Sequence, residues 1–192
     1  STPRPSSAAS DVYKRQSFTH VHPIVPLVLW TPVILFLLYR GATVKGVSAP
    51  EFIFLFFFGL ILWSFTEYIL HRYVFHWDAK SRAGKYFVFL FHGLHHDDPQ
   101  DPTRLVMPPV PAILIYLLLW SFFSLFFPDK YLGVIMAFFM VGYLCYDYIH
   151  YATHHFAMTS KVGKYLRKYH LQHHYSGAVS YTHLRAHETS LH

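Results

Sequence analysis

The sequence is poor in cysteine and in charge, and both shortages narrow its chemistry. One cysteine, Cys145, excludes an intramolecular disulfide and any cysteine-based zinc or iron–sulfur site. Only 14% of the residues are charged, whereas 53% are hydrophobic and lie in long blocks, which is typical of a membrane protein. The sequence also contains neither a glycine-rich phosphate loop nor a serine or cysteine nucleophile motif.

The chain carries a formal net charge of +6, but its basic residues cluster beside the apolar blocks. In that position they set membrane topology and contact anionic lipid, so we do not expect nucleic acid as a partner.

Both ends of the chain read like remnants of one short DNA element. Residues 11–16 can be encoded by GATGTGTATAAGAGACAG, and its reverse complement, read from the third base, encodes residues 179–183. This element resembles a transposon-end sequencing adapter. We therefore expect residues 1–16 and 179–192 to be adapter-derived, which leaves 17–178 as one domain truncated at its carboxyl end. Two genuine polar tails are the alternative.

Four apolar blocks are long enough to cross a bilayer, and they comprise residues 24–39, 52–70, 110–127 and 132–149. A helix of about 20 residues covers roughly 30 Å, the thickness of the hydrocarbon core. The sequence therefore predicts an all-α membrane protein with four transmembrane helices. Residues 128–131 are predicted to form a tight turn between the last two helices.

Four spans place the amino end, the loop 71–109 and the carboxyl end on one side, together with most basic residues and all the clustered histidines. Because positive residues are retained in the cytoplasm, we expect a cytosolic helical cap that holds these histidines.

The histidines recur in four clusters of regular spacing. Residues 92–96 and 170–174 each place histidines at i, i+3 and i+4, and such positions share one face of a helix. Imidazole is a common ligand of catalytic transition metals, and ten imidazoles exceed the capacity of one ion, which favours a dimetal site. The predicted metal ligands are His71, His76, His92, His95, His96, His150, His154, His170, His173 and His174.

Two histidine positions do not fit one face of an ideal helix. His71 and His76 are five residues apart, about 140° around an α-helix. We therefore expect that the helix ends between them or that they bind different metals. His155 points about 140° away from His150, and we expect it to support the site or to lie at the membrane interface.

Two carboxylates are predicted to orient ligands and to offset the metal charge. Glu67 precedes His71 by four residues and Asp147 precedes His150 by three. Both lie in apolar blocks, where a carboxylate is costly and usually functional. Charges at helix ends near the interface are the alternative.

An all-histidine site for two metals at a membrane surface suits the activation of dioxygen for attack on a lipid chain. Iron is expected for activity, whereas zinc could occupy the same ligands but has no redox chemistry. A membrane metal-binding or transport protein, or a haem cytochrome, is the alternative of another class. A transporter, however, binds its ions near the bilayer midplane.

The histidine strings resemble those of the fatty acid hydroxylase/sterol desaturase superfamily, and they lie at residues 71–76, 92–96, 146–154 and 170–174. Within that superfamily, Glu-Tyr-x-x-His-Arg at residues 67–72 and the string at residues 104–112 resemble the fatty acid 2-hydroxylase branch more specifically.

This resemblance implies hydroxylation at C2 of a fatty acyl chain, free or in a sphingolipid, with O2 and electrons from a cytochrome b5-type donor. It maps the ten metal-binding histidines of the family onto the ten predicted ligands. It also implies a further segment after the last box, so this chain could bind metal yet be inactive. A sterol- or carotenoid-type hydroxylase or a lipid desaturase of the same superfamily stays the alternative, and the oligomeric state stays open.

Overall fold

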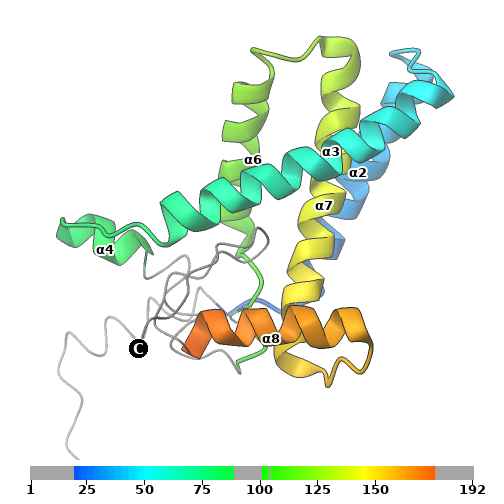
Figure 1. The fold of residues 1–192 in the computed structure, drawn as a ribbon. Coiled ribbons are helices and arrows are strands. Elements are labelled where there is room, and N and C mark those ends of the chain that lie inside the picture. The colour runs from blue at the N-terminus through cyan, green and yellow to red at the C-terminus, as the bar shows by residue number, and fades with distance from the viewer. Residues whose placement is uncertain (1–19, 89–100, 104, 176–192) are drawn as a thin grey trace, which may run out of the picture.

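The structure is a computed structural model that describes residues 20–88, 101–103 and 105–175 (Figure 1). All regular secondary structure in these ranges is helical, as predicted. The elements are α2 (Val25–Thr43), α3 (Ala49–Ile69), the π-helix η2 (Leu70–Phe75), α4 (Arg82–Val88), α6 (Pro109–Phe123), α7 (Asp129–His155) and α8 (Lys161–Tyr175).

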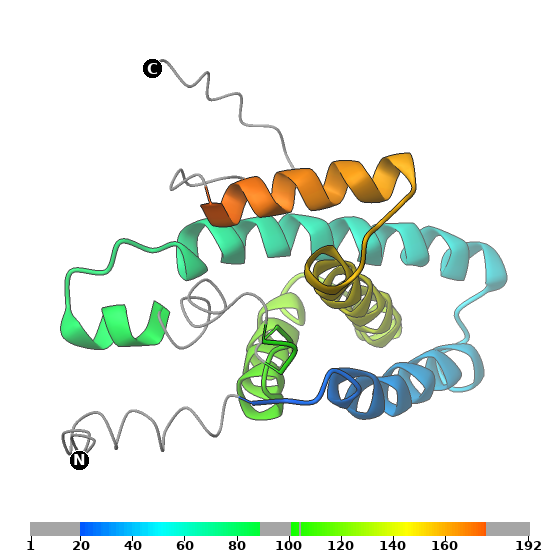
Figure 2. The same ribbon diagram turned by 90° about the horizontal axis from the view of Figure 1, so that it is seen from below.

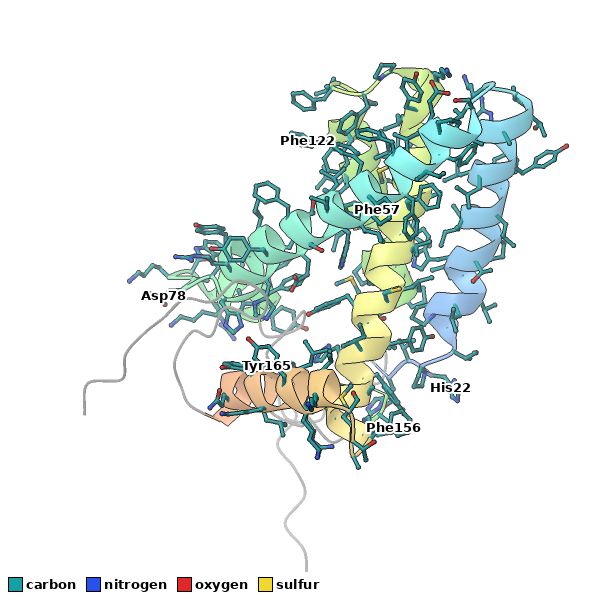
Figure 3. The ribbon with its side chains drawn as sticks, turned by 45° about the vertical axis from the view of Figure 1, so that its right-hand side comes forward. His22, Phe57, Asp78, Phe122, Phe156 and Tyr165 are labelled. Atoms are coloured by element: carbon teal, nitrogen blue, oxygen red, sulfur yellow. The ribbon has the colours of Figure 1, made fainter. Side chains whose placement is uncertain are left out.

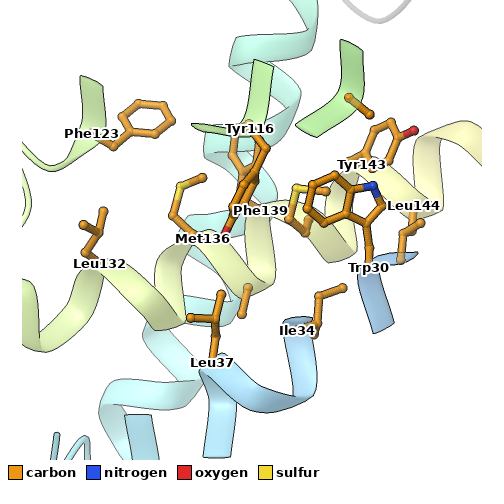
Figure 4. Close-up of a cluster of buried hydrophobic side chains, with 13 residues drawn as sticks. Trp30, Ile34, Leu37, Tyr116, Phe123, Leu132, Met136, Phe139, Tyr143 and Leu144 are labelled. Atoms are coloured by element: carbon orange, nitrogen blue, oxygen red, sulfur yellow. The ribbon is translucent and has the colours of Figure 1, made fainter. Parts of the chain in front are cut away.

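α7 is the central helix, and α2 and α3 pack along it. The main core joins side chains of α2, α6 and α7 around Met136 and Phe139, which are 0% and 1% exposed (Figure 4). Trp30 of α2 contacts Tyr116 of α6 across this core, with ring centroids 4.9 Å apart. The first half and the middle of α7 are thereby held from several sides, and this fixes the direction of the last turns, which carry candidate ligands.

α3 crosses α7 diagonally, and glycines on both helices allow the close approach (Figure 1). A Cβ atom on Gly59 would lie 2.6 Å from the Cβ of Phe138, and one on Gly142 would lie 2.7 Å from the Cβ of Trp63. Small residues at crossing points commonly permit such packing between membrane helices. Beyond the crossing, the end of α3 extends away from the end of α7 (Figure 1).

Three helices are long and apolar enough to cross a membrane, namely Val25–Thr43, Ala49–Phe75 and Asp129–His155. α6 covers most of the third predicted span but has only 15 residues. Residues 124–127 form turns, and Pro128 disfavours a helical residue before it. The structure thus confirms an all-helical protein with three candidate spans, and the fourth span stays a prediction.

The predicted turn at residues 128–131 is wrong in its position. α7 already begins at Asp129, with Pro128 as its N-cap, so the connection lies at residues 124–128. Outer faces of the helices carry large apolar side chains, such as Phe57 and Phe122, which are 59% and 52% exposed (Figure 3). Lipid can cover such surfaces in a membrane.

Polar side chains join the start of α3 to the start of α7. The carboxylate of Glu51 accepts hydrogen bonds from Lys130 at 2.8 Å and from the Tyr131 hydroxyl at 2.6 Å. Glu51 also forms a capping box with Ser48, which defines where α3 begins. This network sets the register between α3 and α7 at one end of the bundle.

At the opposite end, α8 lies across the end of α7 (Figures 1 and 2). The chain reverses near Met158, whose φ of 43° lies in the left-handed region. Arg167 of α8 then donates a hydrogen bond to the carbonyl of Phe156, just after α7. The turn therefore places a face of α8 against the last turns of α7.

Candidate metal centre

Three predicted ligands converge where α7 meets α8. His150 and His154 lie one turn apart on α7, with ring centroids separated by 5.3 Å. The ring of His170 from α8 lies 4.5 Å from that of His150 and 4.6 Å from that of His154, between centroids. One nitrogen from each ring lies within 4.8 Å of the others. The spacing in the sequence predicts that His150 and His154 share one face of α7. The turn between α7 and α8 then brings His170 to the same point.

The chemistry of this donor set fits a metal ion. The Nε2 atoms of His154 and His170 are 2.6 Å apart, so both ring edges face the same point. His150 and His154 are buried, and His170 is half-buried. Three imidazole nitrogens around one point suit zinc or iron, which both accept nitrogen ligands.

His71 and His76 form a second pair, and the helix ends between them, which is one of the two outcomes expected from the sequence. α3 continues into the π-helix η2, which ends at Phe75 with His76 as its C-cap. The backbone N–H of His76 donates to the carbonyl of His71 at 3.1 Å. This i→i+5 pattern stacks residues five apart, and the ring centroids are 4.6 Å apart. The structure therefore places both imidazoles on one face.

His76 is suited to the neutral form that metal binding requires. Burial lowers the pKa of its imidazole below the ordinary value, so the ring stays uncharged at neutral pH.

The other predicted ligands lie outside the described residues or side chains. His71 and His76 lie outside the convergent group of His150, His154 and His170. The residues His92, His95 and His96 are not described, and for His173 and His174 only the backbone, in the last turn of α8, is described. The ten-ligand set therefore stays a prediction.

Both predicted carboxylates are buried. Each precedes a predicted histidine ligand by three or four residues in the sequence. Glu67 of α3 is 5% exposed and Asp147 of α7 is 4% exposed. The Tyr143 hydroxyl donates to Oδ2 of Asp147 at 3.2 Å. Sequence reasoning missed this tyrosine, although its i−4 spacing from Asp147 could have indicated the contact.

Aromatic rings support His150 from the α3 side. The ring of Tyr146 lies 5.8 Å from that of His150, and Trp63 of α3 lies 5.9 Å from Tyr146, between centroids. His155 does not join the convergent group. Its ring packs against that of Tyr151, with centroids 4.5 Å apart, and its buried Nε2 has no hydrogen-bond partner within the described part of the chain.

Comparison with known proteins identifies the family to which the chain is similar. The family model for fatty acid hydroxylases matches residues 56–187. A dihydroceramide fatty acyl 2-hydroxylase of Arabidopsis thaliana is 37% identical, over 77% of this chain and 62% of that protein. A fatty acid 2-hydroxylase of Mus musculus is 35% identical, over 77% of this chain and 45% of that protein.

A solved structure has the same fold. It is that of full-length scs7p, in which only the hydroxylase domain is visible, with a TM-score of 0.75 and 33% identity. The match covers 83% of this chain and 60% of the other. The chain thus spans about half to two thirds of the length of these relatives. Since the family model matches well over half of the chain, the protein belongs to the fatty acid hydroxylase family.

Proposed function

We propose that this chain forms the hydroxylase domain of a membrane-bound dimetal monooxygenase. Its reaction is hydroxylation at C2 of a fatty acyl chain, free or within a sphingolipid. The names of the relatives support this substrate class. The observation that carries the proposal is the convergence of His150, His154 and His170 at the end of a membrane-length helix.

The ten predicted histidines hold two metal ions in this proposal. Five of these ten histidines are the convergent group His150, His154 and His170 and the pair His71 and His76. A bound iron pair supplies the redox chemistry by which one atom of O2 enters an unreactive C–H bond. Glu67 and Asp147 accept hydrogen bonds from ligand N–H groups, which keeps each ring oriented and offsets the metal charge.

The position of the site suits reaction at C2. That carbon is adjacent to the polar carboxyl or amide group of the acyl chain. While the chain stays among the apolar spans, its polar end lies at the membrane surface. Metal ligands at the end of α7 therefore meet the first carbons of the chain rather than its middle.

The proposed topology has four crossings with the histidines in a cytosolic helical cap. α6 covers about 22 Å as a 15-residue helix, and the turns at residues 124–127 complete the fourth crossing. The excess of basic residues on the histidine side supports a cytoplasmic orientation. Electrons come from a cytochrome b5-type donor on that face. The domain comprises residues 17–178, and both flanking segments derive from the adapter.

Expression in cells that lack 2-hydroxylated lipids tests the reaction. We expect 2-hydroxy acyl chains to accumulate, as measured by mass spectrometry of total lipid. His170→Ala should lower product by more than about 100-fold, since even residues outside the ligand set change metal sites by about 10–100-fold. His155→Ala is the matched control and should retain both product and iron.

Elemental analysis of the purified variants separates loss of metal from loss of substrate. His170→Ala should also reduce bound iron. A new double bond in place of the hydroxyl group would contradict the proposed reaction. Equal loss of iron in the two variants would contradict the assignment of the site.

A further inference from the structure

A short segment after η2 exposes aromatic and basic side chains together. It comprises residues 77–88, including α4 (Arg82–Val88). Its exposed aromatic residues are Trp77, Tyr86 and Phe87, at 53%, 42% and 40%. Its exposed basic residues are Lys80, Arg82 and Lys85. None of these residues is among the predicted metal ligands.

The 77–88 segment is folded back on itself. The hydroxyl of Ser81 accepts a hydrogen bond from the backbone N–H of Gly84 at 3.1 Å. A Cβ atom on Gly84 would lie 2.8 Å from the Cβ of Ala79 and 3.1 Å from the ring of Trp77. Glycine at this position therefore lets α4 pack beside Trp77.

This packing holds the segment near the end of a membrane span. The candidate span Ala49–Phe75 ends two residues before Trp77. Two residues reach at most about 7 Å, so Trp77 must lie at the edge of the bilayer if that helix crosses it. Because α4 packs against Trp77, α4 is held at the same depth.

The charge of the segment is positive. Its only carboxylate is Asp78, which lies 3.4 Å from the ammonium group of Lys80. Side chains of both residues are about nine-tenths exposed, so water screens this pair and it neutralises little at a distance. Three cations and one anion leave a net charge of +2. Figure 3 shows Asp78 at the far end of α3, well away from Phe156 after α7.

We propose that residues 77–88 rest on the membrane surface and bind anionic phospholipid. Tryptophan and tyrosine favour the depth of the headgroups, where one edge of the ring is apolar and the other is wet. Lys80, Arg82 and Lys85 contact headgroup phosphates, and the net negative charge of the lipid retains them. This inference requires that α3 crosses the membrane, but it does not depend on the proposed reaction.

Native mass spectrometry of the purified protein with equimolar phosphatidylserine and phosphatidylcholine tests the inference. The variant replaces Lys80, Arg82 and Lys85 with glutamine. The matched control replaces Lys161, Lys164 and Lys168 of α8 with glutamine. Each basic residue near a membrane contributes about five-fold, so the preference for the anionic lipid should fall more than ten-fold in the first variant. It should change less than two-fold in the control.

A second measurement uses a spin label at Ala83→Cys in a Cys145→Ser background. In nanodiscs with phosphatidylserine, collisions of the label with a water-soluble nickel chelate should fall several-fold relative to phosphatidylcholine alone. This result stands even if the charge variant does not fold. Equal collision rates in the two lipids would overturn the proposal. An unchanged lipid preference in the first variant would also overturn it. So would collision rates that fall only when an acidic protein, rather than anionic lipid, is added.

Discussion

Asp147 lies inside a membrane-length helix and is 4% exposed, with the Tyr143 hydroxyl 3.2 Å from its carboxylate. A carboxylate in such a place is costly unless it is hydrogen-bonded. Asp147 precedes the predicted ligand His150 by three residues, and the proposed role in orienting a ligand explains why a carboxylate is present there. At the scale of single residues, the burial of Asp147 is explained by its neighbours rather than by the helix.

Replacement of Tyr143 by phenylalanine tests this contact. The ring that packs edge-on against Trp63 remains, while the donor to Asp147 is lost. We expect the free energy of unfolding in mixed micelles to fall by about 1–3 kcal/mol, because a buried acceptor loses its partner. Tyr165→Phe, at a residue 48% exposed on α8, should stay within about 0.5 kcal/mol. Equal values for the two variants would contradict a contribution from this hydrogen bond.

The π-helix η2 brings together two residues that an α-helix with the same spacing would hold apart. Five residues separate His71 from His76, and an α-helix would turn them about 140° apart. The widened turn instead brings their ring centroids to 4.6 Å. Single-turn π-helices occur often at functional sites, and this one directly follows α3.

Two helical glycines make a matched test of element packing. A Cβ atom on Gly59 would lie 3.0 Å from the backbone nitrogen of Phe139, an atom that cannot rotate away. Gly59→Ala should therefore push α3 from α7 and lower the free energy of unfolding by about 1–3 kcal/mol.

Gly133 serves as the control, since its added Cβ would meet only a Leu37 methyl group at 3.5 Å. Gly133→Ala should be neutral or stabilising by up to about 1 kcal/mol, because alanine favours helix. Thermal unfolding in detergent measures both variants. A tolerated Gly59→Ala would show that the two helices can separate without cost.

At the scale of the whole molecule, the two ends of the bundle differ in chemistry. One end holds the Glu51 network, and the other holds the histidines of η2, α7 and α8. The proposed four-span topology puts these ends on opposite sides of the membrane.

Cysteine labelling of sealed vesicles tests that topology in a Cys145→Ser background. Thr43→Cys and Ser124→Cys should react with an impermeant maleimide from the same side, and Ser160→Cys from the other. All three positions are exposed in the structure. If Thr43 and Ser124 react from opposite sides while α3 crosses the membrane, α6 does not cross it, and the proposal of four spans is wrong.

Much of the helical organisation could be predicted from the sequence. Long apolar blocks must form helices in a bilayer, because every backbone group needs an internal partner there. The boundaries were less predictable, as α6 and the start of α7 show. A turn and a helix end differ by only a few backbone hydrogen bonds. The amino-acid composition of the segment does not predict which of the two forms.

The sequence by itself determined the helical class, the family and the one-turn pairing of His150 with His154. These depend on consecutive residues and on the fixed geometry of a helix. Only the three-dimensional structure decided that His170 joins them and that the ring of His71 lies beside that of His76. The first contact depends on the turn near Met158, and the second on a local widening of the backbone. Neither contact produces a helical period in the sequence, because the first depends on how separate elements pack and the second on a departure from α-helical geometry.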